Sequence, residues 1–173
     1  MKNFIICIVL LLASLVSYSQ HFPETWIGNW SGELNWWKGA ATEPQKVKMQ
    51  LRIQPSGSGH QFSWQIIYDS DEKDNRPYIL KAVDTAKGHW QIDEQNGIVL
   101  DQYFIAGKFS GAFTVQSSTI INNYWLQGSE LHVEFYNISA QPVAVTGHGT
   151  EESPSVNSYQ VKTYQKAVLY RTK

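Results

Sequence analysis

The side chains best suited to metal or acid–base chemistry lie on one predicted strand, where Glu130, His132 and Glu134 alternate with apolar residues. Alternate residues of a strand share a face, so these three could bind a metal ion or exchange a proton together. The same alternation is typical of the solvated side of a half-buried strand. We favour that interpretation and predict no metal site, here or among the other histidines, which show no metal-ligand spacing.

A second acidic group surrounds the Asn96-Gly97 turn, where Asp93 and Glu94 precede the turn and Asp101 follows it. A pair of carboxyl groups can carry out glycoside hydrolysis when both face the same bond. Asp93 and Glu94 are adjacent, however, so they face opposite sides of a strand. Acids beside a hairpin turn commonly serve solubility, and we predict no catalytic residue among them.

Cysteine usage and motif content exclude several classes of enzyme. The single cysteine, Cys7, lies in the apolar N-terminal run, so residues 20–173 contain none. A cysteine nucleophile, a thiolate zinc site and an iron–sulfur cluster are therefore excluded from that part of the chain. Neither a Gly-x-Ser-x-Gly elbow nor a phosphate-binding or dinucleotide-binding loop is present. We expect no cofactor, and an enzyme is the less favoured interpretation.

The first nineteen residues have the pattern of a secretory signal peptide. A short basic start, Met1-Lys2-Asn3, is followed by the apolar run 4–16 and by Ser17-Tyr18-Ser19, which offers small residues to a signal peptidase. We predict cleavage between Ser19 and Gln20 and an exported protein, periplasmic or secreted. A retained membrane anchor is the alternative, but the apolar run is short for a bilayer span.

Residues 20–173 show the period-two alternation of half-buried β-strands almost throughout. Asn96-Gly97 is a strong hairpin turn signal, whereas the charged stretch 69–77 and the segment 141–158 are predicted loops. About eight to ten strands with short connections predict an all-β antiparallel meander, and closure into a barrel removes its edges. An outer-membrane barrel is disfavoured because one face of several strands carries charge, at Lys46, Lys48, Arg52, Glu130 and Glu134.

Both ends of this domain resemble the calycin superfamily, that is, the lipocalins and their fatty-acid-binding and avidin-type relatives. The first predicted strand begins at Trp26 and contains Gly28-Asn29-Trp30 with Gly32 beyond, similar to the Gly-x-Trp motif of those families. Arg171, near the end of the last predicted strand, stands where their conserved arginine covers that tryptophan. The resemblance implies a single lipocalin-like barrel over residues 20–173, with a mouth loop at 39–45 and structural roles for Gly28, Trp30, Gly32 and Arg171. The lipocalin disulfide, the Thr-Asp-Tyr-type motif and the C-terminal helix are missing, so the chain resembles the looser lipocalin-like proteins of bacteria and not a true lipocalin.

Polar residues on otherwise apolar strand faces indicate the function. A buried amide or hydroxyl costs free energy unless it is paired, so a barrel interior containing several of them favours water, mutual pairing or a ligand. We predict that the barrel holds a small apolar or amphipathic molecule, although a filled core whose polar atoms satisfy one another remains open. The candidate ligand-binding residues are Trp26, Trp36, Trp64, Tyr68, Phe113, Asn122, Tyr124 and Thr163.

The alternative is a solid-core module of the cell envelope that binds carbohydrate or protein through surface aromatics. Trp36 and Trp37 are adjacent and cannot both face the core of a strand, so one of them lies outside or at a rim. Nucleic acid is not an expected partner, because the formal net charge is -1 and no run of Lys or Arg occurs. No transmembrane segment is predicted beyond residue 19, and the oligomeric state is left open.

Overall fold

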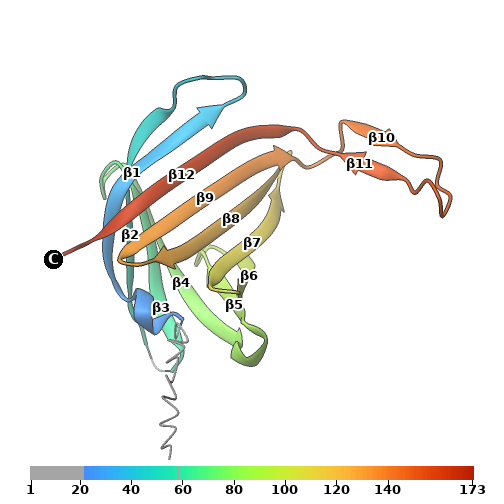
Figure 1. Cartoon of the computed structure of the whole chain (residues 1–173). Coiled ribbons are helices and arrows are strands. Elements are labelled where there is room, and N and C mark those ends of the chain that lie inside the picture. Colours follow the sequence, from blue (N-terminus) through green and yellow to red (C-terminus); the bar gives the residue numbers. More distant parts are fainter. Residues whose placement is uncertain (1–21, 58) are drawn as a thin grey trace, which may run out of the picture.

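The computed structural model describes residues 22–57 and 59–173, so the predicted signal peptide at 1–19 and its cleavage site lie outside the described residues. Ten strands form a closed antiparallel barrel in the order β1-β12-β9-β8-β7-β6-β5-β4-β3-β2 (Figure 1). The predicted fold class is confirmed, including the number of barrel strands. The elements are η1 (Glu24–Trp26), β1 (Gly28–Lys38), β2 (Gln45–Pro55), β3 (Gln61–Tyr68), β4 (Asp74–Asp84), η2 (Thr85–Lys87), β5 (His89–Asp93), β6 (Val99–Ile105), β7 (Lys108–Val115), β8 (Ser118–Gln127), β9 (Glu130–Ser139), β10 (Ala144–Thr146), β11 (Val156–Ser158) and β12 (Val161–Thr172).

The alternation of the sequence determines which side chains face inward. On β3, Phe62, Trp64 and Ile66 are all buried, and Tyr68 continues the same face. On β6, Gln102 is 1% exposed whereas Tyr103 is 42% exposed, so Gln102 faces the interior and Tyr103 faces outward. Each strand thus contributes one row of apolar residues to a single interior cluster.

Aromatic residues close one end of the barrel. Trp26 and Trp64 are fully buried there, and Phe22 makes ring contacts with Trp26, Trp90 and Phe109. The first strand begins at Gly28, so the expectation that Trp26 opens it is wrong. Trp26 ends the 3-10 helix η1 instead, which carries its indole across the barrel end.

The predicted Arg–Trp contact joins the two ends of the chain at this closed end. The guanidinium of Arg171 lies 4.4 Å from the centre of the Trp30 ring. It also donates to the carbonyl of Ile27 and, at 2.7 Å, to the carbonyl of Thr25. Gly28 leaves room for it, because an added Cβ would lie 2.6 Å from Arg171 Nη1. The last strand and η1 are therefore held together by one side chain.

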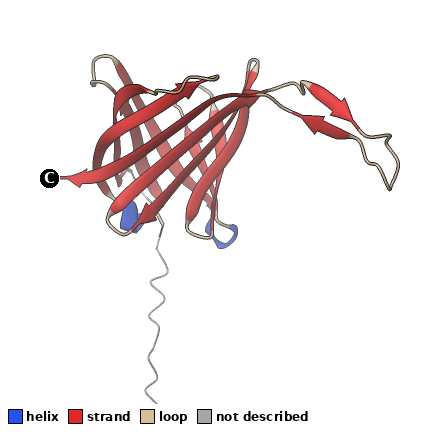
Figure 2. Cartoon of the chain, turned by 45° about the horizontal axis from the view of Figure 1, so that its top comes forward, coloured by secondary structure: helices blue, strands red, loops and turns tan. Residues whose placement is uncertain are grey.

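A two-stranded arm projects from the other, open end. The segment 141–158, predicted as a loop, contains the hairpin of β10 and β11, whose residues are all exposed. The arm leaves the barrel between β9 and β12 and extends away from it (Figures 1 and 2). At the base of the arm, the backbone N–H of Ser139 donates to the carbonyl of Gln160 at 2.8 Å.

Two features of the wall concern the open end. The charged stretch 69–77 was predicted to be a loop, but β4 already begins at Asp74. Pairing of β4 with β5 starts only at Ile79, so the first residues of β4 pair with β3 alone. Such an edge segment tolerates proline, here Pro77. Strands β6 and β7 pair at three positions only, over 103–105 and 108–110, so they part toward the open end.

Among the described residues no helix is long and apolar enough to cross a membrane.

Candidate ligand cavity at the open end of the barrel

A cavity of about 160 Å³ lies in the open half of the barrel. Eight of the ten barrel strands or the turns that follow them supply its lining, so side chains far apart in sequence converge on it. Its lining consists of Ile66, Tyr68, Arg76, Tyr78, Ile92, Glu94, Leu100, Gln102, Phe113, Ile120, Asn122, Tyr124, Phe135, Tyr136, Asn137 and Gln165. Apolar and polar groups alternate around one space, which is the lining that an amphipathic molecule requires.

A pair of amides forms a polar wall of the cavity. Asn122 Nδ2 donates to Gln102 Oε1 at 2.8 Å, and Gln102 Nε2 donates to Asn122 Oδ1 at 3.3 Å. The pair fits only because residue 111 is glycine, where an added Cβ would lie 2.2 Å from Gln102 Nε2. Gln102 thus spans the place where β6 and β7 part and reaches Asn122 on β8. Two buried amides satisfy each other there while part of their surface lines the cavity.

Phenol groups form a second polar element. Burial raises the pKa of Tyr68 from 10.0 to about 12 and that of Tyr124 further still. Both phenols are therefore neutral at physiological pH and able to donate a hydrogen bond. Tyr124 packs edge-on against Trp64, at 5.2 Å between ring centres, and against Phe135, at 5.7 Å. Tyr124 consequently separates the solid core from the cavity.

The mouth of the cavity carries charge. Arg76 donates to both carboxylate oxygens of Asp74 at 2.9 Å, and its guanidinium lies 4.9 Å from the centre of the Tyr68 ring. Bonding to Arg76 holds the pKa of Asp74 below its usual value, so the pair stays ionised. Glu94 faces the same space, and its carboxylate accepts a hydrogen bond from Asn96 Nδ2 at 3.4 Å. The carboxylate of Glu94 thus has no cationic partner within the described residues.

The structure brings half of the predicted ligand-binding residues together. Tyr68, Phe113, Asn122 and Tyr124 line the cavity. Trp26 and Trp64 lie in the closed-end core, fully buried. Trp36 and Thr163 lie on inward-facing positions near the open rim but outside the lining. The ligand contacts themselves stay predictions.

Sequence reasoning missed the charged part of the site. Arg76 was assigned to the loop 69–77 and Glu94 to hairpin solubility, and Tyr78 was not considered, whereas all three line the cavity. The alternation of Asp74, Arg76 and Tyr78 with other residues is a strand signal, but the charges and Pro77 obscured it. Asn137 was missed as well, although its Oδ1 is buried and lacks a hydrogen-bond partner in the described part of the chain.

The other candidate sites are dispersed. His132 contacts Glu130 at 3.1 Å and stacks on Trp125 on the outer face. Asp93 pairs with Lys81 at 2.6 Å, and Asp101 contacts His89 at 2.7 Å, so neither faces Glu94. Across residues 22–57 and 59–173, no group of three or more His, Cys, Asp or Glu side chains is arranged to hold a metal ion.

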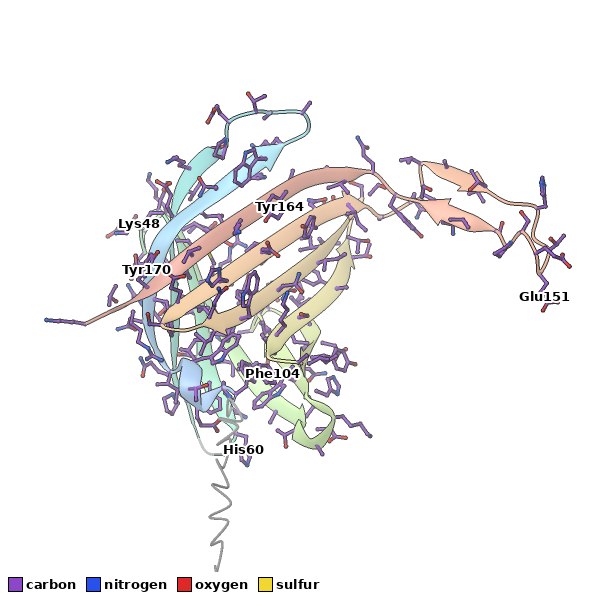
Figure 3. The ribbon with its side chains drawn as sticks, viewed as in Figure 1. Lys48, His60, Phe104, Glu151, Tyr164 and Tyr170 are labelled. Atoms are coloured by element: carbon purple, nitrogen blue, oxygen red, sulfur yellow. The ribbon has the colours of Figure 1, made fainter. Side chains whose placement is uncertain are left out.

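The outer aromatics lie on β1, β12 and β9. Trp37 stacks on Tyr164 at 5.6 Å, and Tyr164 contacts Tyr136 at 4.9 Å. Figure 3 shows Tyr164 on the outer side of β12. These ring contacts cover part of the aromatic surface, and Tyr136 remains 36% exposed. The hydroxyl of Tyr164 is also engaged, since it donates to Glu134 at 2.8 Å.

Comparisons with protein-family models, with curated proteins and with solved structures found no match. The closed antiparallel barrel of ten strands is consistent with a lipocalin-like fold. The candidate site therefore stands on the geometry of the cavity.

Proposed function

We propose that this protein is an exported, lipocalin-like binding protein that holds one small amphipathic molecule in the open end of its barrel. The observation that carries the proposal is the cavity itself, in which apolar side chains such as Phe113 and Ile120 face amide and phenol groups across one space. A filled core would have paired these groups with one another and left no volume. The Gln102–Asn122 pair is satisfied in that way, whereas Asn137 Oδ1 has no partner among the described residues.

The volume limits the size of the molecule. Pockets that enclose a drug-sized ligand measure about 300–1,000 Å³, whereas an apolar cavity of about 150 Å³ binds benzene. At about 160 Å³, the enclosed space takes one ring or a short branched chain. The remainder of a larger molecule would lie in the mouth, beside Arg76 and Glu94. The proposal is therefore a small-molecule carrier or sensor and not a long-chain lipid carrier.

Two further elements belong to the proposal. Export rests on the signal-peptide pattern of residues 1–19. Calycin kinship is supported by the Arg171–Trp30 contact at the closed end, which joins the first and last strands as the resemblance implies. Together, these two features support a binding protein that acts in the cell envelope or outside the cell.

Native mass spectrometry of the protein purified from its producing cells tests the function. We expect a reproducible mass of a small molecule that disappears on denaturation. The variant Ile120→Phe fills the cavity and should lose this mass, whereas Ile105→Phe, at a position 64% exposed at the end of β6, should retain it. A bound mass that survives Ile120→Phe in a folded protein would place the ligand elsewhere and refute the proposal.

A further inference from the structure

The charges at the cavity mouth do not balance. Asp74 and Arg76 neutralise each other through two bonds, whereas Glu94 has no salt-bridge partner in the described part of the chain. The mouth therefore carries one net negative charge, on a side chain that faces the cavity. Coulomb attraction across such a half-enclosed space is several times stronger than in bulk water.

The neighbouring cations are engaged elsewhere. Lys38, near the open end of β1, lies 3.8 Å from the centre of the Trp36 ring. Lys162 donates to Ser117 O at 2.7 Å and to Ser118. Neither side chain lines the cavity. Within residues 22–57 and 59–173, no lysine or arginine forms a salt bridge with Glu94.

A second, independent observation concerns hydrogen bonding. Asn137 Oδ1 is a buried acceptor that lacks a partner in the described part of the chain, and Asn137 lines the same cavity. A buried carbonyl oxygen without a donor is costly, so a ligand that brings an N–H or O–H donor would complete the site. Aromatic side chains also line the space, namely Tyr78, Phe113 and Tyr68, and the guanidinium of Arg76 already lies over the Tyr68 ring. Aromatic rings attract cations.

We propose that the ligand is a small organic amine that binds as its cation, with its apolar part in the cavity and its ammonium group at Glu94. This inference rests on the proposed function. Asn137 Oδ1, on the lining of the same cavity, is open to a hydrogen-bond donor of the ligand. The structure disfavours a carboxylate ligand, because Arg76 is already engaged by Asp74 and Glu94 would repel it.

Three probes of one size separate the alternatives: benzylammonium, benzyl alcohol and benzoate, each titrated by isothermal calorimetry at neutral pH. We expect benzylammonium to bind at least about tenfold more tightly than benzyl alcohol, or about 1.4 kcal/mol, and benzoate to bind most weakly. Glu94→Gln should remove that advantage and leave the affinity for benzyl alcohol unchanged. Glu151→Gln, which makes the same charge change at the tip of the arm, should have no effect (Figure 3).

The outcomes distinguish the two proposals. If benzyl alcohol or benzoate binds the unmodified protein as tightly as benzylammonium does, the cationic ligand is overturned while the binding cavity stands. If none of the three binds, the proposed cavity function fails and the amine with it. Because the order of affinities is measured on the unmodified protein, the result does not depend on the folding of any variant.

Discussion

The buried amide pair of Gln102 and Asn122 provides the sharpest test of how this barrel is built. Gln102 is 1% exposed and Asn122 is 4% exposed, and each satisfies the other across strands β6 to β8. Replacing one partner by an apolar residue of similar shape leaves the other amide buried without its bonds. Replacing both removes the polar groups altogether. The variants are Gln102→Met, Asn122→Leu and the double variant.

The expected magnitudes follow from the cost of an unpaired buried group, about 1–3 kcal/mol. Each single variant should lower the free energy of unfolding by about 2 kcal/mol, because water in the neighbouring cavity meets part of the lost bonding. Independent effects would add to about 4 kcal/mol, whereas the double variant should lose only about 1 kcal/mol. The quantity predicted is the coupling energy between the two substitutions, not the loss of stability in either single variant.

Urea unfolding followed by tryptophan fluorescence measures all three variants. The matched control is Gln65–Asn75, an exposed pair on β3 and β4 in which Gln65 Nε2 donates to Asn75 Oδ1 at 2.9 Å. Gln65→Met and Asn75→Leu should each change stability by less than about 0.5 kcal/mol, since water replaces the lost partner. Additive losses at Gln102 and Asn122 would show that the two amides do not depend on each other and would refute the reasoning.

Three further predictions concern the closed end, the phenols and the arm. Arg171→Ala should lower the free energy of unfolding by about 2 kcal/mol, since two charge-assisted bonds and the contact with Trp30 are lost. Measured by the same urea assay, Arg171→Lys should recover less than half of that loss. Because the folded-state pKa of Tyr68 is raised to about 12 from 10.0, its contribution to stability is complete below pH 10 and is lost as the pH rises toward 12. The melting temperature should fall over that range, and Tyr68→Phe should make the fall smaller; an equal fall in the variant would exclude Tyr68 as the cause. Replacing residues 141–158 by a two-residue turn should leave both the melting temperature and benzylammonium binding unchanged, because β10 and β11 are exposed throughout, and a loss of binding would assign the arm a part in the site.

The strand faces could be predicted because they depend on local alternation. The period of two along Phe62, Trp64 and Ile66 places these residues on the core side whatever the neighbouring strands are. The same rule placed Asn122 and Tyr124 inside. The closing contact of Arg171 with Trp30 was also accessible, through a motif at each end of the chain.

The cavity and its charges depended on the tertiary structure. Alternation says that a residue faces inward but not at which end of the barrel it lies, so Trp26 and Trp64 were grouped with Tyr68 although they fill the closed end. Arg76 and Glu94 were missed because charge and proline locally indicate a loop, whereas pairing with β3 makes Arg76 part of a strand. The sequence by itself determined a meander of strands with polar residues on its apolar face. Which of those residues meet around one space was decided only by the closure of β1 on β12. The reason is that residues of different strands are brought together by the pairing of strands and not by their spacing along the sequence.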